Sequence, residues 1–168
     1  QTGERDGRVF LQGFGGDSSN FAIAAARQGA HVAYTSALGD DPYGRMLRAL
    51  WTREGVDQRG VRTNAAAFTA IYFVTHDQRG HHFNFFRTGS AASLMQPADL
   101  PRALIEGARV FHLSGISLAI SDQACDTGFA AIHIAPHTVV FAFPVGIWLG
   151  LMAWKSGSIW PGVIAHAA

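Results

Sequence analysis

Charge is distributed unevenly along this chain, and the unevenness divides it into two parts. All acidic residues and all arginines lie at or before Asp126, and Lys155 is the only formal charge after that position. Charged side chains cover the surfaces of soluble domains because they are almost never buried without a partner. Residues 1–126 therefore have the composition of a soluble domain, and residues 127–168 do not.

The overall composition restricts the classes of partner and the cellular compartment. A chain of 168 residues is long enough for one domain with a sizeable core. Its net charge of +1, without a basic stripe, argues against nucleic acid as a partner. Cys125 is the only cysteine, so no internal disulfide forms, and we expect a reducing cytoplasm. The first residues lack an initiator Met and an apolar signal region, so we expect residues upstream of Gln1.

Apolar periodicity predicts alternating strands and helices in the first part. The predicted strands are residues 31–39 and 109–116, with residues 8–14 as a short strand or hairpin. The predicted helices are residues 18–30, 40–55, 96–108 and 121–132. We expect a Ser or Asp side chain to cap the helix at 18–30 and Ser121 to begin the last one. This alternation is typical of an α/β layered fold with a mainly parallel sheet.

Two aromatic and β-branched segments, residues 68–76 and 81–87, interrupt that alternation. They are joined by Asp77-Gln78-Arg79-Gly80, a short connection that ends in glycine. Such a pattern predicts a β-hairpin, which we expect to act as a flap.

An uncharged segment, residues 138–154, dominates the second part. Its length reaches the roughly 17 to 25 residues that span a bilayer. Trp148, Trp154 and Trp160, with Lys155, are residue types that mark a membrane interface. The alternative is a buried helix of a large soluble domain, but this chain offers little protein to cover it. We therefore favour membrane contact through residues 138–154.

The segment Gly15-Gly16-Asp17-Ser18-Ser19-Asn20 leads into a predicted helix and is a candidate binding site. Free N–H groups at a helix start favour polar or anionic ligands, and glycines let a ligand approach the backbone. The alternative is a tight turn with an Asx cap.

Arg87 follows the second aromatic strand, where it is placed to pair with a substrate carboxylate, while Tyr72 and Phe86 are candidate pocket walls. The alternative is an exposed arginine that ends a hairpin. His81 and His82 are adjacent on a strand and so point to opposite faces, which makes them poor joint metal ligands. The sequence contains no P-loop and no GxSxG elbow.

Four segments in this order resemble the ribokinase-like PfkB carbohydrate kinases, and among them the 2-keto-3-deoxygluconate kinases. They are GGDSSNFAIAAARQGA, YTSALGDDPYGRMLRALWTREGVD, IYFVTHDQRGHHFNFFRTGSAAS and VFHLSGISLAI, within about residues 3–131. The resemblance implies an α/β sandwich with a small β lid, a sugar bound under the lid, and transfer of the γ-phosphoryl group of ATP, with Mg²⁺. It also implies that Gly15, Gly16 and Asn20 hold sugar hydroxyls, that Tyr72 lines the lid, and that Arg87 meets a carboxylate.

The chain also departs from this family. The family's Gly-Ala-Gly-Asp-like motif, which carries the catalytic base, has no counterpart here, nor do its first strand and most of its nucleotide site. A missing general base typically costs about 10² to 10⁴ in rate, and positioning of ATP and Mg²⁺ is the other main source of phosphoryl-transfer catalysis. We therefore assign no catalytic residue and expect no turnover.

The second part resembles the CPBP (CAAX-protease-like) intramembrane metalloproteases over about residues 129–168. The resemblance is carried by the FxxxH spacing that ends at His133 and by LGLMAWKSGSIWPGVIAHA, which contains His166. It implies that His133 and His166 belong to a metal site in the bilayer. The Glu-Glu helix of that family is absent, so we expect no protease activity.

These observations predict a kinase-like part at residues 1–131 and an apolar helical tail at residues 132–168, in a truncated or chimeric chain. Three alternatives remain: a sugar-kinase fragment that binds sugar weakly, a membrane-anchored fragment, and a non-catalytic product with exposed sheet edges that aggregates. A homodimer formed through the lid also remains open.

Overall fold

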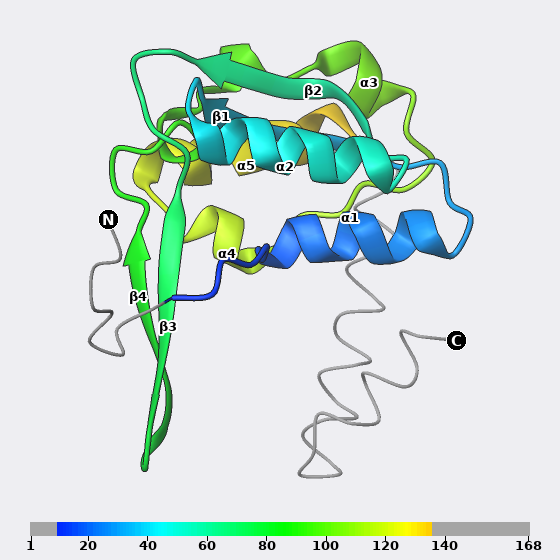
Figure 1. Ribbon diagram of the computed structural model, residues 1–168. Coiled ribbons are helices and arrows are strands. Elements are labelled where there is room, and N and C mark those ends of the chain that lie inside the picture. The colour runs from blue at the N-terminus through cyan, green and yellow to red at the C-terminus, as the bar shows by residue number, and fades with distance from the viewer. Residues whose placement is uncertain (1–9, 136–168) are drawn as a thin grey trace, which may run out of the picture.

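The computed structural model describes residues 10–135, and the structural statements below concern these residues. The helices are α1 (Asp17–Arg27), α2 (Pro42–Arg53), α3 (Arg102–Glu106), α4 (Gly115–Leu118) and α5 (Asp122–Ile134), with 3-10 turns η1 (Ala92–Leu94) and η2 (Pro97–Asp99). The strands are β1 (Ala33–Gly39), β2 (Asp57–Asn64), β3 (Ile71–Asp77) and β4 (Gly80–Phe86). They form a layered α/β body from which the β3–β4 hairpin projects (Figure 1).

The body is built on β1 and β2, which pair in parallel with α2 as the connection between them. The predicted helix over residues 40–55 is confirmed, and it begins at Asp41, whose side chain accepts a hydrogen bond from the Gly44 N–H at 2.7 Å. Pro42 occupies the first turn, where its missing N–H costs nothing. Strand β2 was not predicted, because its sequence DQRGVRTN is polar and buries only Gly60 and Val61.

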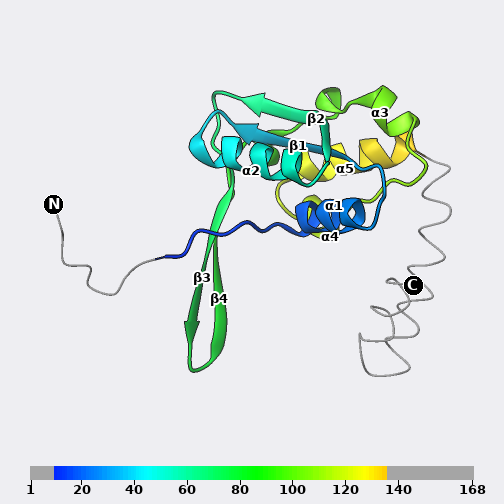
Figure 2. The ribbon, with the colours of Figure 1, turned by 45° about the vertical axis from the view of Figure 1, so that its right-hand side comes forward.

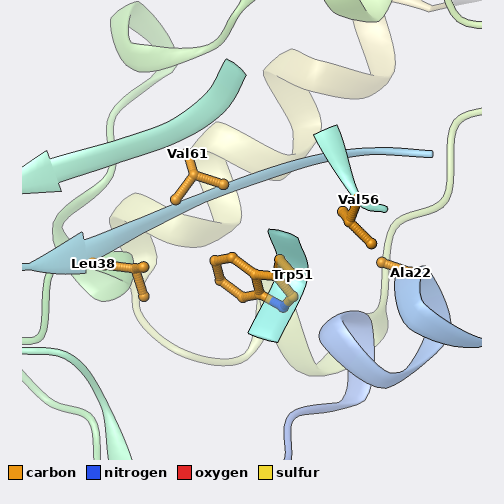
Figure 3. Packing of buried hydrophobic residues seen from close by; sticks show 5 residues of the cluster. All are labelled: Ala22, Leu38, Trp51, Val56 and Val61. Atoms are coloured by element: carbon orange, nitrogen blue, oxygen red, sulfur yellow. The ribbon is translucent and has the colours of Figure 1, made fainter. Parts of the chain in front are cut away.

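One face of the strand pair carries the main core, and the indole of Trp51 lies in the middle of it. Trp51 is 2% exposed and contacts the ring of Tyr34 edge to face, with the centroids 4.8 Å apart. The cluster joins α1, β1, α2 and β2 through Ala22, Leu38, Trp51, Val56 and Val61 (Figure 3). This packing fixes α1 and α2 against the same face of the sheet.

The opposite face is covered by the segment that follows the hairpin and, beyond it, by α5. Ala37 of β1 packs against Ala91 and Met95, and a third cluster joins Ile105 of α3 to Ala131 of α5. Helices therefore lie on both sides of the strand pair, as the predicted α/β class requires. Ser121 begins α5 by accepting a hydrogen bond from the Ala124 N–H at 3.1 Å, which confirms that prediction.

The predicted β-hairpin is confirmed. β3 and β4 pair antiparallel, with Ile71 opposite Phe86 and Asp77 opposite Gly80. Every residue of β4 is exposed, and the two strands extend together away from the body in both views (Figures 1 and 2). Within residues 10–135 no further strand pairs with either edge of the hairpin.

Two predicted strands are wrong. Residues 10–14 have no regular structure, and Leu11 is 98% exposed, so no neighbouring strand supports them. Residues 8 and 9 lie outside the described residues. Residues 109–114 also form no strand, because Phe111 packs into the cluster around α3 and α5, and Ser114 caps α4 by accepting from the Ile116 N–H at 3.1 Å. A strand needs a hydrogen-bonded neighbour, and the described residues supply none here.

The single helix predicted at residues 96–108 is also wrong. Pro97 begins the 3-10 turn η2, and Pro101 precedes α3, which is only Arg102–Glu106. Proline cannot donate the backbone hydrogen bond that would carry a helix through these positions, so the segment divides into two short pieces.

Helix α5 runs without a break through residue 131, the predicted end of the kinase-like part, to Ile134. None of the helices described in this chain is both long and apolar enough to span a membrane. The predicted membrane segment, residues 138–154, lies outside the described residues, as does most of the tail at 132–168. That boundary and that segment remain predictions.

Candidate functional site

The candidate site begins where the chain enters α1. Gly16 has φ 133° and ψ 125°, a left-handed conformation that favours glycine. No side chain caps this helix end, so the predicted Ser or Asp cap is wrong. The Asp17 carboxylate instead accepts a hydrogen bond from the Ser114 hydroxyl, which ties this helix end to the start of α4. The first N–H groups of α1 therefore remain without a capping side chain.

Tyr72 of the hairpin lies directly on this glycine segment. A side chain at position 15 would overlap the Tyr72 hydroxyl, and its Cβ would lie 3.0 Å from the Tyr72 Cζ. A larger residue at position 15 would therefore require the Tyr72 side chain to move. The structure thus brings together Gly15, Gly16 and Tyr72, which the sequence singled out separately.

The Tyr72 face of the hairpin carries further aromatic rings. Phe85 lies directly opposite Tyr72 in the antiparallel register, with the ring centroids 5.8 Å apart. The Phe83 ring is 6.1 Å from that of Tyr72 and stacks on Phe85 at 6.0 Å. Phe83 and Phe85 were not among the predicted site residues, although the period-2 alternation of the strand places them on one face.

Arg87 extends over the same face. Its guanidinium carbon lies 5.0 Å from the centroid of the Phe85 ring, a cation–π contact. Arg87 is half-buried, and no carboxylate within the described part of the chain forms an ion pair with it. Its donors are therefore available to a ligand on the Tyr72 side of the hairpin.

Phe86 lies on the other face. Its ring contacts Phe73 edge to face at 5.6 Å, and Phe73 contacts Phe10 at 4.9 Å. The expectation that Tyr72 and Phe86 line one pocket together is corrected, because neighbouring positions in a strand point to opposite sides. Phe85, and not Phe86, lies on the same face of the hairpin as Tyr72.

Asn20 lies one turn beyond Gly16 on α1, and its backbone N–H donates to the Gly16 carbonyl at 2.8 Å. Its exposed side chain borders a surface cavity of about 450 Å³, together with Ile23, Ala24, Arg27 and Gln28. Asn20 therefore shares the start of α1 with the two glycines, but the cavity that its side chain borders is lined by later residues of the helix and by neither glycine.

Two serines at the start of α1 hold the candidate site on the body. The Ser18 hydroxyl is 2.8 Å from the Tyr34 hydroxyl, and the Ser19 hydroxyl accepts a hydrogen bond from the Trp51 indole N–H at 2.8 Å. Burial raises the pKa of Tyr34 above its ordinary value, although its hydrogen bond to Ser18 opposes that shift. The sequence places these serines in the candidate binding segment, but their contacts with Tyr34 and Trp51 could not be inferred without the fold.

The described residues contain no metal site. No group of three or more His, Cys, Asp or Glu side chains within residues 10–135 could hold a metal ion. His133 lies on α5 with its Nδ1 2.7 Å from the Phe129 carbonyl oxygen, and His166 is outside the described residues. His81 contacts His76 and His82 contacts Asp77, which confirms that adjacent histidines point to opposite faces.

Comparison with known sequences places these features in a family. Residues 4–147 match the family described as pfkB family carbohydrate kinase, a range that runs past residue 131. Probable fructokinase-3 of Arabidopsis thaliana is 42% identical over 127 residues, which are 75% of this chain and 36% of that protein. Fructokinase-1 of Oryza sativa subsp. japonica is 42% identical over 128 residues, 76% of this chain and 39% of that protein. This chain thus spans less than half the length of these relatives.

Solved structures of sugar kinases of this family resemble the structure of this chain. A fructokinase from Xylella fastidiosa superposes with a TM-score of 0.73 at 28% identity, covering 82% of this chain and 43% of that one. The structure of that fructokinase with bound ATP superposes with a TM-score of 0.73 at 28% identity, covering 80% of this chain and 41% of that one. A PfkB protein from Polaromonas sp. JS666 superposes with a TM-score of 0.67 at 33% identity, covering 71% of this chain and 41% of that one. From the family match over most of its length, this chain belongs to the pfkB family of carbohydrate kinases.

Proposed function

We propose that this chain provides the sugar-binding part of a carbohydrate kinase, with the sugar held between the start of α1 and the hairpin. The proposal rests on the contact between the Tyr72 hydroxyl and the backbone of Gly15. Uncapped N–H groups on one side and a phenol on the other form a polar site with an aromatic wall. A sugar, which offers hydroxyls at its edges and an apolar ring face, has the matching chemistry.

The substrate class follows from two observations. The relatives reported above are fructokinases, which supports a neutral ketose with fructose as the first candidate. Arg87, which has no carboxylate partner within residues 10–135, supports a sugar acid such as 2-keto-3-deoxygluconate as the second. Among the groups that distinguish the two candidates, only the carboxylate of the acid can form a bidentate pair with a guanidinium.

We also propose that this chain binds sugar without phosphorylating it. The sequence contains no Gly-Ala-Gly-Asp-like motif to supply a base. The ATP-bound fructokinase supports ATP as the donor in the family. Residues 10–135 present no set of groups that we assign to ATP, so the chain's own residues bind and orient the sugar.

Titration calorimetry with fructose and with 2-keto-3-deoxygluconate tests the proposed sugar site and distinguishes the two substrate candidates. We expect Tyr72→Ala to weaken binding of either sugar. We expect Arg87→Ala to weaken binding of the acid by about tenfold or more and to leave fructose unchanged, since hydrogen bonds to charged groups are worth about 1.5 to 3 kcal/mol. Arg79→Ala is the matched control, because it removes the same charge from the exposed tip of the same hairpin. Absence of heat with both sugars would contradict the proposed function.

A homodimer through the hairpin stays a proposal with one supporting observation. Phe83, Phe85 and Phe86 are all more than half exposed, and neither edge of the hairpin is paired within the described residues. Exposed aromatic surface and open strand edges favour association. A sedimentation coefficient that rises with concentration in the wild type and not in Phe83→Ser would support the dimer.

A further inference from the structure

One carboxylate, that of Asp41, connects the base of the hairpin to the start of α2. Oδ1 of Asp41 accepts the hydrogen bond from the Gly44 N–H at 2.7 Å, at the start of α2. Oδ2 of Asp41 accepts from the Thr69 N–H at 2.6 Å, in the segment that enters β3. The two oxygens of one side chain therefore connect the first turn of α2 to the base of the hairpin.

Thr69 completes this connection from the other side. Its hydroxyl accepts a hydrogen bond from the Gly39 N–H at 3.0 Å, at the last residue of β1. Thr69 is only 3% exposed, so both its backbone and its side chain are held inside the body. The end of β1, the start of α2 and the entrance to β3 thus meet at Asp41 and Thr69.

The returning strand is held next to this point. The Ala91 N–H donates to the Phe68 carbonyl at 2.9 Å, and the Ser90 N–H donates to the Arg87 carbonyl at 3.0 Å. Ser90 is fully buried, whereas every residue of β4 before it is exposed. The hairpin therefore changes from anchored to exposed within a few residues of Thr69.

We propose that Asp41 is a positioning residue for the sugar site, which sets the direction of the hairpin and thereby holds Tyr72 over Gly15. Thr69 precedes Tyr72 by three residues, so a rotation of the chain at Thr69 moves the phenol away from the glycines. Asp41 itself touches no residue of the site. The expected effect of Asp41 on sugar binding rests on the proposed function. The expected effect of Asp41 on the position of the hairpin does not depend on that function.

The test uses four variants of the full chain. Asp41→Asn keeps a good helix cap, but a carboxamide has one acceptor oxygen and cannot serve both N–H groups. Thr69→Val removes the hydroxyl and keeps the shape, and Thr69→Ser restores an acceptor. Asp40→Asn is the matched control, because Asp40 is the adjacent acid and forms only an exposed ion pair with Arg45 at 3.1 Å.

The first measurement is made without sugar. We expect Asp41→Asn and Thr69→Val to lose the nuclear Overhauser contact between the Tyr72 ring and Gly15. In Asp41→Asn, amide exchange in residues 71–86 should accelerate by about tenfold, since a hydrogen bond to a charged group is lost. In Thr69→Val, which loses a neutral hydrogen bond, the acceleration should be smaller. Apart from Gly39 and Gly44, whose N–H groups bond directly to Thr69 and Asp41, residues 33–64 should accelerate less than residues 71–86. Asp40→Asn and Thr69→Ser should behave as the wild type.

The second measurement is the dissociation constant for fructose, which we expect Asp41→Asn to raise. An unchanged Tyr72–Gly15 contact in Asp41→Asn would overturn the proposal, as would faster exchange spread equally over residues 33–64 and 71–86. Loss of the contact in a chain that binds no sugar would confirm the positioning of the hairpin and overturn only the proposed function.

Discussion

The hydroxyl of Tyr72 occupies the space that a side chain at Gly15 would need. We expect Gly15→Ala to displace the hairpin and to weaken sugar binding by about tenfold, which corresponds to 1.4 kcal/mol. Calorimetry measures the change. Gly13→Ala is the control, because a Cβ at position 13 has no atom within 4 Å. Tyr72→Phe removes the overlapping oxygen, so the double variant Gly15→Ala with Tyr72→Phe should lose less than the two single changes together. Strict additivity would contradict the contact.

Ser19 is the hydrogen-bond partner of the Trp51 indole N–H within the core. We expect Ser19→Ala to lower the free energy of unfolding by about 1 to 3 kcal/mol, because it leaves a buried donor without a partner. Urea denaturation measures this change. In a Trp51→Phe background, the same Ser19→Ala change should cost much less, since the donor is already absent. An equal cost in both backgrounds would rule out the hydrogen bond as its cause.

The ionised form of Asp41 makes a pH-dependent contribution to stability. Partial burial raises the pKa of the Asp41 carboxyl, but hydrogen bonds from Thr69 and Gly44 outweigh burial and hold the pKa below its ordinary value. A group with a lowered folded pKa stabilises the fold above its unfolded pKa of about 3.9, and this stabilisation disappears as the pH falls through the folded value. The stability difference between the wild type and Asp41→Asn should therefore be largest near neutral pH and shrink in acid.

Thermal or urea unfolding across that pH range measures the difference. Asp40→Asn should show a smaller difference throughout, because an exposed ion pair contributes little. A difference between the wild type and Asp41→Asn that grows on acidification would contradict the assignment.

Gly44 lies inside α2, where alanine normally stabilises a helix by about 1 kcal/mol relative to glycine. Here a Cβ would collide with the Gly39 carbonyl oxygen and lie 2.9 Å from the Thr69 hydroxyl. We therefore expect Gly44→Ala to destabilise the protein by about 1 to 3 kcal/mol. Gly115→Ala, at the start of α4 with no atom within 4 Å of its Cβ, should change stability by less than about 0.5 kcal/mol. Denaturant midpoints of the two variants check the contrast.

The sequence predicted the elements whose signals are local. The hairpin at residues 68–87 was predicted because alternating aromatic residues and a short turn ending in Gly80 are contained in the strands themselves. Helix α2 was predicted from its apolar face and the acids at its start, and its Asp41 cap was found in the structure. These features need no knowledge of the rest of the fold.

The errors concern elements that depend on their neighbours. The polar strand β2 exists because the parallel edge of β1 pairs with it, which its own composition does not indicate. Residues 109–114 have the composition of a buried strand, yet they lack a pairing neighbour among the described residues. Strand formation is thus decided by partners distant in the sequence.

The candidate site shows the same division. The glycines at the start of α1 and the aromatic hairpin were each selected from the sequence, and their contact was implied only by the family resemblance. The contact between Tyr72 and Gly15 joins residues far apart in the chain, so no local pattern encodes it. Phe86 was predicted to line the pocket with Tyr72, but Phe85 lies on the Tyr72 face. The alternation of side chains along a strand could have identified the correct residue.

The cluster around Trp51 draws all its buried members from residues 22 to 61. During synthesis these residues leave the ribosome before the hairpin and before α5, so this core can close while the remainder is still being translated. Contacts of short sequence separation also form fastest. The hairpin and α5 would then fold against an α1–β1–α2–β2 unit that has already formed.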